Sequence, residues 1–330
     1  MNQAFVSSLA CPVCKGDLHL DQSSPSDQEI ESGTLQCANA HTFPIVRGLP
    51  RFVSSDGYAS NFGFEWNLHN KTQLDTTTRH ESEATLIEKT GFQPDDLKDK
   101  LVLDVGCGMG RFSEVASRWG ATVVGIDLTS AVDAAYGNLK DRPNVHLAQA
   151  DVFKLPFRDE TFDFIFSIGV LHHTPNTRSA FDQLPKLLKP GGRIAIWVYS
   201  TTMRTWSMTS DLYRHVTTRL PKRVLYAMCR VAIPWYHVNR VPGIGRYAWR
   251  LLPTSIHQDP EWRVLDTFDW YSPTFQWKHS DAEVRDWFES HGLVSLVSLS
   301  FPTSMQGMRP KTSDMAREAP AEIPVSKGSR

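Results

Sequence analysis

The chain has 330 residues, a formal net charge of −1 at pH 7 and 41% hydrophobic residues. These values are typical of a globular chain of about two domains, and they exclude a collagen-like, coiled-coil or fully disordered protein. No run reaches the roughly 18 uninterrupted apolar residues of a membrane-spanning helix, and residues 1–10 lack the parts of a secretory signal. We therefore expect a soluble, cytoplasmic protein whose overall charge gives no sign of nucleic-acid binding.

Three of the five cysteines lie in the first forty residues. Cys11 and Cys14 are two residues apart, and Cys37 forms a second pair with His41. Three thiolates and one imidazole complete the closed tetrahedral shell that structural zinc prefers, with no open position for catalysis. An odd cysteine count also argues against a disulfide framework. We predict a structural Zn²⁺ at these four residues, the alternative being free side chains.

The central part of the chain alternates short apolar strands with helices, starting with a strand over residues 101–105. This strand leads into a glycine-rich turn and an amphipathic helix near residues 111–119. A helix over residues 184–188 and a turn over 189–192 precede the fifth strand. Strands after the first are expected at residues 121–126, 145–148, 162–167 and 193–199. This alternation predicts an α/β fold with a doubly wound, mostly parallel sheet.

The glycine-rich turn is typical of nucleotide-binding folds, because glycine lets the backbone turn tightly and approach a ligand. The dinucleotide-binding pattern requires a glycine where this chain has Arg111, so the turn departs from the NAD pattern. Asp127 ends the second strand, 19 residues after Gly108, where such folds hydrogen-bond ribose hydroxyls. The sequence therefore keeps a ribose-binding carboxylate without the NAD fingerprint.

Five successive segments resemble the motifs of class I S-adenosylmethionine-dependent methyltransferases of type 11. The segments are LVLDVGCGMGRF, VVGID, QADVFKLPF, FDFIFSIGVLHHTPN and LLKPGGRIAIWV, in the family's order and spacing. The resemblance implies a Rossmann-like fold, S-adenosyl-L-methionine as cofactor, and methyl transfer by direct displacement. The alternative is a domain of this fold that binds another nucleotide or none.

The resemblance also implies a set of cofactor-binding residues near the ends of the first four strands. From the methionine part through ribose and adenine to the sulfonium end, they are Asp104, Gly106, Gly108, Gly110, Asp127, Leu128, Asp151, Val152, Ser167, Ile168 and Gly169.

Two histidines follow the fourth strand, where such folds open onto the methyl acceptor. A base is useful if the acceptor is a hydroxyl or a protonated nitrogen, and histidine is suited to this near pH 7. We predict His172 as the base or as the group that positions the acceptor, with His173 as second choice. The alternative is that both only pack in a loop.

The N-terminal segment resembles the small zinc ribbons that precede some bacterial methyltransferase domains. A similar pattern occurs in ribosomal-RNA guanine-N1 methyltransferases, where the ribbon helps to hold RNA. Residues 1–52, however, contain three basic and five acidic residues, whereas a phosphate backbone attracts cations. Nucleic acid is therefore the less favoured partner.

The segments that flank the core also contain patterns that predict local structure. Residues 62–66 resemble the cap segment of these enzymes, and Trp66 is a candidate cover for the cofactor. An S-x-x-E capping box at Ser280 predicts a helix, followed by strands at 293–301 and 304–308, the last of them antiparallel. The polar residues 311–330 are expected to be disordered.

About 80 residues, 201–279, separate the fifth strand from the capped helix. Parallel sheets bind ligands beyond the carboxyl ends of their strands, so this helical insertion should lie over the reaction site. It holds six of the ten tryptophans, and residues 204–250 contain nine Lys or Arg and one acid. We expect a lid for an anionic or lipid-linked acceptor that also contacts anionic membrane. The alternative is a helical subdomain with a solvated basic face.

These features divide the chain into six parts. The predicted parts are a zinc ribbon (1–52), a helical cap (53–100), the cofactor-binding core (101–200), the insertion (201–279), the end of the core (280–310) and the tail (311–330). The favoured function is methyl transfer to a small-molecule or lipid-linked acceptor. The alternatives are an RNA methyltransferase and a non-enzymatic cofactor-binding scaffold. The sequence does not determine the acceptor or the oligomeric state.

Overall fold

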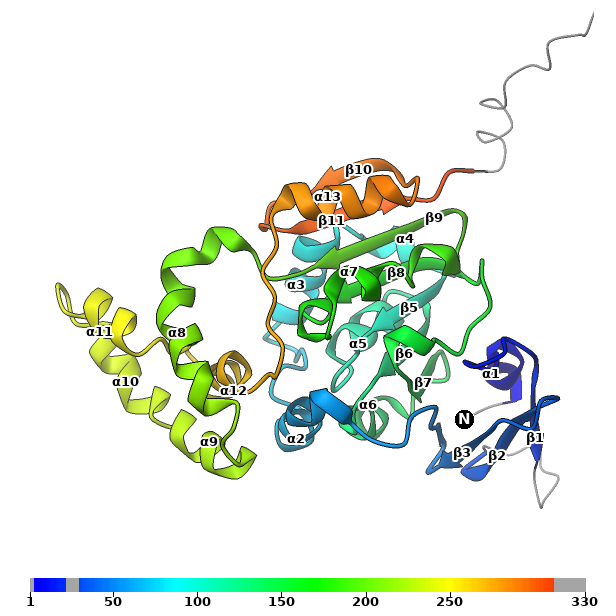
Figure 1. Cartoon of the computed structure of the whole chain (residues 1–330), viewed down its shortest axis with the longest axis horizontal. Coiled ribbons are helices and arrows are strands. Elements are labelled where there is room, and N and C mark those ends of the chain that lie inside the picture. The colour runs from blue at the N-terminus through cyan, green and yellow to red at the C-terminus, as the bar shows by residue number, and fades with distance from the viewer. Residues whose placement is uncertain (1–2, 22–29, 312–330) are drawn as a thin grey trace, which may run out of the picture.

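The computed structural model describes residues 3–21 and 30–311. Over this part of the chain, the strands form a seven-stranded and a four-stranded sheet that lie side by side (Figure 1). The tail that we expect to be disordered lies outside the described residues from 312 onward.

The seven-stranded sheet has the order β10-β11-β9-β8-β5-β6-β7. Strands β5 to β9 pair in parallel, and β11 pairs antiparallel with both β9 and β10. The strands are β5 Leu101–Val105, β6 Thr122–Asp127, β7 Val145–Gln149, β8 Phe162–Ile168, β9 Leu188–Trp197, β10 Val294–Ser298 and β11 Ser304–Met308. This topology confirms the predicted doubly wound sheet with an antiparallel last strand.

Alternate residues of the same strands pack into two hydrophobic clusters, because successive side chains of a strand point to opposite faces. Val102 and Phe164 pack with α3 and α5, whereas Leu103 and Ile165 belong to the cluster that includes α7 and α13. Both faces of the sheet are therefore covered by helices, which explains why its strands are continuous apolar runs.

The helices that cover the sheet and lead into it are mostly short. They are α2 Ser60–Leu68, α3 Glu81–Thr90, α4 Pro94–Leu97, α5 Arg111–Arg118, α6 Ala131–Leu139, α7 Thr177–Phe181 and α13 Asp281–Ser290. Ser280 caps α13, since its hydroxyl accepts a hydrogen bond from the Glu283 N–H while the Glu283 carboxylate accepts one from the Ser280 N–H. The predicted capping box is thus confirmed. Short 3₁₀ helices occupy Gly57–Ala59, Val152–Lys154, Leu171–His173, Pro185–Leu187 and Thr201–Met203.

The helix predicted over residues 184–188 is present, but it is a short 3₁₀ helix and not part of an α-helix. The α-helix of this region, α7, ends before it, and Pro185–Leu187 forms a single 3₁₀ turn that leads into β9. Proline lacks an N–H donor and therefore suits the first turn of a helix rather than its interior. The turn expected at 189–192 is an irregularity within β9, where the register against β8 shifts and Gly191 has a φ of 81°.

The four-stranded sheet comes from the first 50 residues and follows the short helix α1 Gln3–Ser8. Its antiparallel strands are β1 Leu18–Asp21, β2 Ser32–Cys37, β3 Thr42–Val46 and β4 Leu49–Pro50. Leu9 and Leu35 belong to the same hydrophobic cluster as Phe157 of the large sheet's region, and a bridge joins Leu9 to Phe157. The small sheet therefore shares its core with the rest of the molecule.

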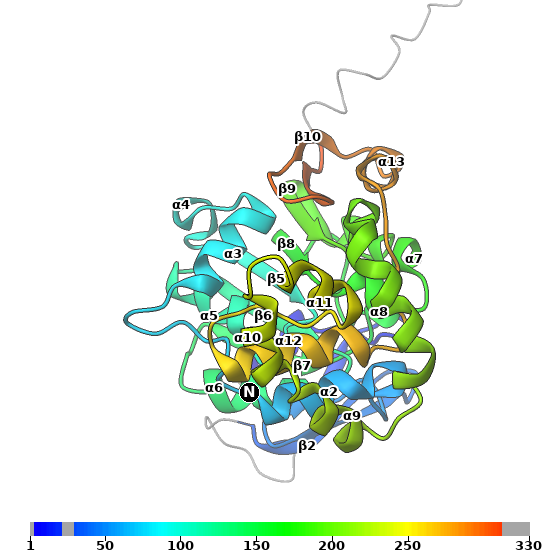
Figure 2. The same cartoon turned by 90° about the vertical axis from the view of Figure 1, so that its left-hand side faces the viewer.

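The helices between β9 and α13 form a lobe at one side of the large sheet (Figures 1 and 2). They are α8 Arg204–Thr217, α9 Lys222–Cys229, α10 Ala232–Asn239, α11 Gly245–Leu251 and α12 Pro260–Tyr271. Helix α12 contacts α2 and packs Val264 and Phe268 against Leu225 and Cys229 of α9. No helix in the described ranges is both long and apolar enough to cross a membrane.

Candidate functional site

A cavity of about 360 Å³ lies at the carboxyl ends of β5, β6 and β8, bordered by α2 and α12. Its lining combines the glycine-rich turn with aromatic and acidic side chains from several elements. Among the lining residues are Trp66, Gln73, Gly106, Gly108, Arg111, Asp127, Leu128, Thr129, Val152, Ile168, Gly169, His173, Trp197, Tyr199, Asp266, Asp269 and Trp270.

The glycine-rich turn has no room for side chains. Gly106 has a φ of 79°, and a Cβ added there would lie 2.4 Å from a methyl carbon of Val170. At Gly108 an added Cβ would lie 3.3 Å from the Trp66 indole nitrogen, so this tryptophan stands directly over the turn. The backbone at these positions is thereby brought to the cavity wall.

The carboxylate of Asp127 ties the glycine turn to the end of β6. It accepts hydrogen bonds from the Gly108 N–H at 3.0 Å, and from the Thr129 N–H at 2.8 Å and hydroxyl at 2.7 Å. Burial raises the pKa of this carboxyl group above its ordinary value. Asp127 and the neighbouring Leu128 both line the cavity.

Seven of the eleven sequence-predicted cofactor residues line the cavity, and the other four lie in the same elements without lining it. The Asp104 carboxylate accepts a hydrogen bond from the Ser113 hydroxyl at 2.6 Å, and burial raises its pKa to about 7. The Ser167 hydroxyl donates to the Val105 carbonyl at 3.0 Å. Asp151 caps the 3₁₀ turn that begins at Val152.

The fourth of these residues, Gly110, precedes α5 and has a φ of 89°. A Cβ there would lie 2.6 Å from Leu139, so this glycine allows α5 to approach α6. These four residues therefore stabilise or position the elements whose other residues line the cavity.

Arg111 lines the cavity although sequence reasoning gave it no binding role. Its Nη1 donates to Gln73 Oε1 at 2.6 Å and its Nε to the Ser82 hydroxyl at 3.2 Å. Burial lowers the pKa of the guanidinium to about 10, so it stays charged at pH 7. Its Nη2 is buried and has no hydrogen-bond partner among the described residues. The sequence feature that could have indicated a binding role is that Arg111 stands where the dinucleotide-binding pattern has its third glycine.

The two candidate histidines occupy different environments. The His172 ring is fully buried, stacks on Tyr199 at 3.9 Å between ring centroids, and has no hydrogen-bond partner among the described residues. Burial lowers its pKa well below the ordinary value. His173 lines the cavity, and its Nδ1 lies 2.8 Å from the Phe275 carbonyl. Since a carbonyl only accepts, this contact assigns the proton of neutral His173 to Nδ1.

Helix α12 adds two buried carboxyl groups that sequence reasoning missed. Asp269 lies 3.4 Å from the Tyr199 hydroxyl, and Asp266 accepts a hydrogen bond from the Ser255 hydroxyl at 2.9 Å. Burial raises the pKa of Asp266 to about 6, and burial with the nearby Asp266 raises that of Asp269 to about 7. Glu65 of α2 is buried and unpartnered within the described chain, with its pKa raised by burial and by both aspartates. The sequence feature that could have indicated these groups is the pair Asp266 and Asp269, two acids three residues apart in a mostly apolar helix.

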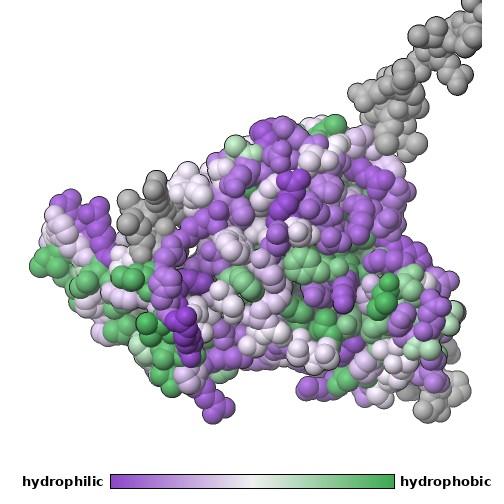
Figure 3. Space-filling view, in the orientation of Figure 1, coloured by the Kyte–Doolittle hydropathy of each residue, from purple (hydrophilic) through white to green (hydrophobic). Residues whose placement is uncertain are grey.

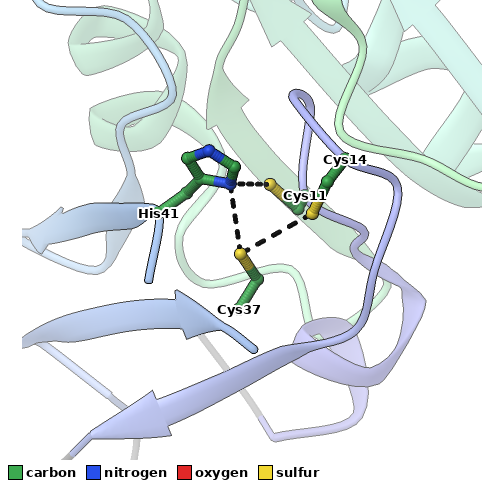
Figure 4. Close-up of side chains that lie close together, drawn as sticks. All are labelled: Cys11, Cys14, Cys37 and His41. Carbon is green, nitrogen blue, oxygen red and sulfur yellow. Dashed lines mark hydrogen bonds between the residues drawn. The ribbon is translucent and has the colours of Figure 1, made fainter. Parts of the chain in front are cut away.

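Cys11, Cys14, Cys37 and His41 converge on one point (Figure 4). The distances are 3.7 Å from Cys14 Sγ to Cys37 Sγ, and 3.3 and 3.5 Å from His41 Nδ1 to the sulfurs of Cys37 and Cys11. A zinc tetrahedron with Zn–S of about 2.3 Å and Zn–N of about 2.0 Å has edges of roughly 3.5–3.8 Å. The backbone N–H of Gly16, followed by the His41 ring, lowers the pKa of Cys14 to about 6 and so favours the thiolate. The four side chains fit a structural Zn²⁺.

Comparison with known proteins agrees with both sites. Residues 103–196 match the family model of a methyltransferase domain, and residues 7–48 match that of a Trm112p-like protein. Sterol 24-C-methyltransferase of Saccharomyces cerevisiae is 30% identical over 302 residues, which cover 87% of this chain and 73% of that protein. The chain belongs to the S-adenosylmethionine-dependent methyltransferases.

Further relatives match over different lengths. Sterol 24-C-methyltransferase of Kluyveromyces lactis is 27% identical over 91% of this chain and 79% of its own length. Ubiquinone biosynthesis O-methyltransferase of Coxiella burnetii is 31% identical over 38% of this chain and 55% of its own length. A solved complex between the Haloferax volcanii Trm112 methyltransferase activator and a putative methyltransferase has a TM-score of 0.47 at 16% identity, covering 78% of this chain and 100% of that chain. The methyltransferase domain uses S-adenosyl-L-methionine, and the Trm112p-like segment with its Cys11, Cys14, Cys37 and His41 cluster carries a structural zinc site.

Arg51 follows the Trm112p-like segment and connects it to the loop after β6. Its guanidinium donates to Gln149 Oε1 at 2.9 Å and to Asp133 at 2.6 Å, and Gln149 Nε2 donates to the Leu128 carbonyl at 3.0 Å. Asp56 completes the connection, since its carboxylate accepts hydrogen bonds from the backbone N–H and the hydroxyl of Ser130. The loop after β6 is therefore held from the zinc-binding side.

We expect one zinc ion per chain, and Cys14→Ser should lose it because three ligands no longer close the shell. Amide hydrogen exchange should then rise over residues 3–21 and 30–52, and the shared core should lower the melting temperature. The exposed His19→Gln serves as a control that keeps the metal. Elemental analysis that finds no zinc in wild-type protein purified without chelator would contradict the assignment.

Arg51→Met should raise the Kd for S-adenosylmethionine about tenfold, because losing a hydrogen bond to a charged group costs about 1.5 kcal/mol. Arg158→Met is the matched control: Arg158 joins the N-terminal segment to the large sheet through Asp17 and the Ser7 carbonyl, away from the loop after β6. Calorimetric titration measures both variants. Equal weakening in the two would mean that Arg51 acts only by anchoring the ribbon.

Proposed function

We propose that this methyltransferase transfers a methyl group to a small, largely apolar acceptor, of the small-molecule or lipid-linked class, bound between the sheet and α12. The observation that carries this proposal is a single cavity lined by two chemically different sets of residues. Gly106, Gly108 and Asp127 contribute the glycine-rich turn and a carboxylate, while Trp197, Tyr199, His173 and the acids of α12 contribute an aromatic and acidic lining. One cavity can thereby take the methyl donor and a compact acceptor together, which is the alignment that direct displacement needs.

The names of the relatives support an apolar acceptor. One group is named for a sterol and another for ubiquinone biosynthesis, and sterols and quinones are apolar molecules. The names differ in the methylated atom, carbon in one group and oxygen in the other. The choice between these atoms must therefore come from the acceptor and from the groups around it.

When bound, S-adenosylmethionine supplies an electrophilic methyl group on a sulfonium. The cofactor residues proposed here are those that line the cavity: Asp127 for the ribose hydroxyls, Gly106 and Gly108 for backbone contact, and Arg111 for the carboxylate. A buried guanidinium with a free N–H matches a carboxylate in charge and geometry. Leu128, Val152, Ile168 and Gly169 complete the lining.

On the acceptor side we propose Asp269 as proton acceptor and His173 as the group that orients the acceptor. A base is most effective when its pKa is near the working pH, and the pKa of Asp269 is raised to about 7. Burial lowers the pKa of His173 to about 4, so its neutral ring accepts a hydrogen bond at Nε2. His172 has no such access and stacks behind the wall on Tyr199.

The RNA alternative is less favoured, because the zinc-binding segment is packed onto the edge of the large sheet and carries more acidic than basic residues. Methyl-labelled S-adenosylmethionine, incubated with the protein and host extract, tests the choice. We expect label in the organic-solvent fraction. Label that enters RNA would overturn the proposal.

The roles of Asp127 and Arg111 predict weaker cofactor binding in their variants. Asp127→Ala and Arg111→Met should each raise the Kd for S-adenosylmethionine by about 10- to 100-fold, since each removes a charge-assisted hydrogen bond of about 1.5–3 kcal/mol. Arg118→Met on the same helix is the control, because its guanidinium pairs with Glu83 and Glu114, which do not line the cavity. An unchanged Kd for Arg111→Met, measured by calorimetry, would remove this arginine from the cofactor site.

The acceptor-side roles predict a pH dependence. The base must be deprotonated, so kcat should rise with pH through about 7, and Asp269→Asn should lower kcat by about 10²–10⁴ and remove this rise. Asp266→Asn should move the rise to lower pH, because a neighbouring negative charge that raises the Asp269 pKa is gone. His172→Asn should change kcat little. A normal profile in Asp269→Asn would reject the proposed base.

A further inference from the structure

The outer surface of the lobe α8–α11 exposes many apolar side chains. Sixteen large apolar side chains are exposed in the described ranges, and ten of them lie between residues 212 and 256. They are Leu212, Val216, Val224, Met228, Val231, Val241, Ile244, Tyr247, Leu251 and Ile256. Figure 3 shows hydrophobic side chains gathered over this lobe, interspersed with hydrophilic ones. Such a concentration is typical of a contact surface.

The side chains on α9 separate into an inner and an outer face. Leu225 and Cys229 are buried in the cluster with α12, each about 3% exposed. Val224 and Met228 are 48% and 53% exposed, and Val231 follows them at helical spacing. The inner face therefore satisfies the packing of the lobe, and the outer apolar stripe is left without a partner in the described structure.

Helices α8 and α11 repeat this arrangement. Leu212 and Val216 are exposed at a spacing of four residues on α8. Ile244, Tyr247 and Leu251 are exposed at spacings of three and four residues along α11. Residues at these spacings share one face of a helix. Three helices of the lobe thus present outward apolar stripes.

Cations border these stripes and no acid offsets them. Residues 212–258 contain eight Lys or Arg and no Asp or Glu. Arg223 and Arg230 flank the stripe of α9, and Arg250 adjoins Leu251 on α11. The side chains of all three are exposed, and within the described part of the chain their guanidinium groups make no hydrogen bond or ion pair. Lys222, by contrast, donates to the Ser60 carbonyl at 2.8 Å and so belongs to the fold.

We propose that the outer face of α8–α11 docks on the surface of an anionic lipid bilayer. Apolar stripes bordered by cations are the features that let a helix lie in the interface of such a bilayer. A second copy of the chain fits this surface less well, because a two-fold contact sets the same patch against itself and would bring two cationic faces together.

The docking surface also has a place in the proposed function, on which this part of the inference rests. Helix α12 contributes Asp266, Asp269 and Trp270 to the cavity on one side and packs against α8, α9 and α10 on the other. A bilayer held on the outer face of the lobe would lie two helical layers from the cavity, the first formed by α12 and the second by α8–α11. An apolar acceptor dissolved in the bilayer would then be concentrated beside the site that uses it.

Vesicle flotation of the full-length protein tests the proposal without cofactor or acceptor. We expect binding to phosphatidylcholine vesicles that contain phosphatidylglycerol, little binding to pure phosphatidylcholine, and release by salt. The triple variant Arg223→Gln, Arg230→Gln, Arg250→Gln should bind about 100-fold more weakly, at about fivefold for each cation. The pair Met228→Ser, Leu251→Ser should weaken binding about tenfold or more through lost apolar burial.

Arg47→Gln combined with Val294→Ser is the matched control, since it removes one exposed cation and one exposed apolar side chain outside the lobe. Circular dichroism and calorimetric binding of S-adenosylmethionine establish that every variant is folded. Absence of binding by the wild type, equal binding to neutral vesicles, or lobe variants that bind like the control would overturn the proposal. Dimers of the wild type that dissociate in the double variant Met228→Ser, Leu251→Ser would also overturn the proposal. Failure of vesicle binding with normal methyl transfer would leave the proposed function intact.

Discussion

The carboxylate of Asp127 is the point on which the arrangement of the methyltransferase depends. It accepts hydrogen bonds from the glycine turn after β5 and from the loop after β6, and thus joins the two loops of the parallel sheet that approach the cavity. From that loop the connections continue through Ser130 and Asp56 to the segment before α2, which carries Trp66 over the turn. A charged group that is hydrogen-bonded on both oxygens is costly to displace, so these loops are held in one geometry.

Burial decides the electrostatic character of the cavity. Helix α12 brings two carboxyl groups to the cavity, α2 adds a third nearby, and Arg111 carries a guanidinium into the same region. Removal of water disfavours the charged forms, which raises the pKa values of the acids and lowers that of His173. The result is that the pKa values of Asp266 and Asp269 rise to about 6 and about 7, while the ring of His173 stays neutral at pH 7. None of these shifts requires an unusual residue type, because the packing of two helices over a sheet end is enough.

The zinc-binding segment and the sheet stabilise each other. The ribbon's apolar side chains belong to the same hydrophobic cluster as the strands of the large sheet, so the metal anchors part of a common core. Arg51 carries the connection further, from the ribbon to the carbonyl that follows Asp127. The zinc-binding segment is thereby connected to the loop after β6.

Local sequence determined the parts of this protein that depend on short-range chemistry. The zinc ligands, the glycine turn, the ends of β5 and β6, the antiparallel last strand and the capping box at Ser280 all follow from patterns within a few residues or from a known order of motifs. At Pro185–Leu187 the predicted helix lies where the sequence places it, but it is a 3₁₀ helix rather than an α-helix.

Tertiary structure alone decided which side chains share the cavity. His172 and His173 are adjacent in sequence, yet one stacks behind the wall and the other lines the cavity, because the 3₁₀ turn that holds them rotates consecutive side chains apart. Asp266 and Asp269 reach the cavity only because α12 packs against α2, more than 190 residues away in the chain. Long-range packing sets burial, and burial sets both access and pKa, so neither could be obtained from the order of residues.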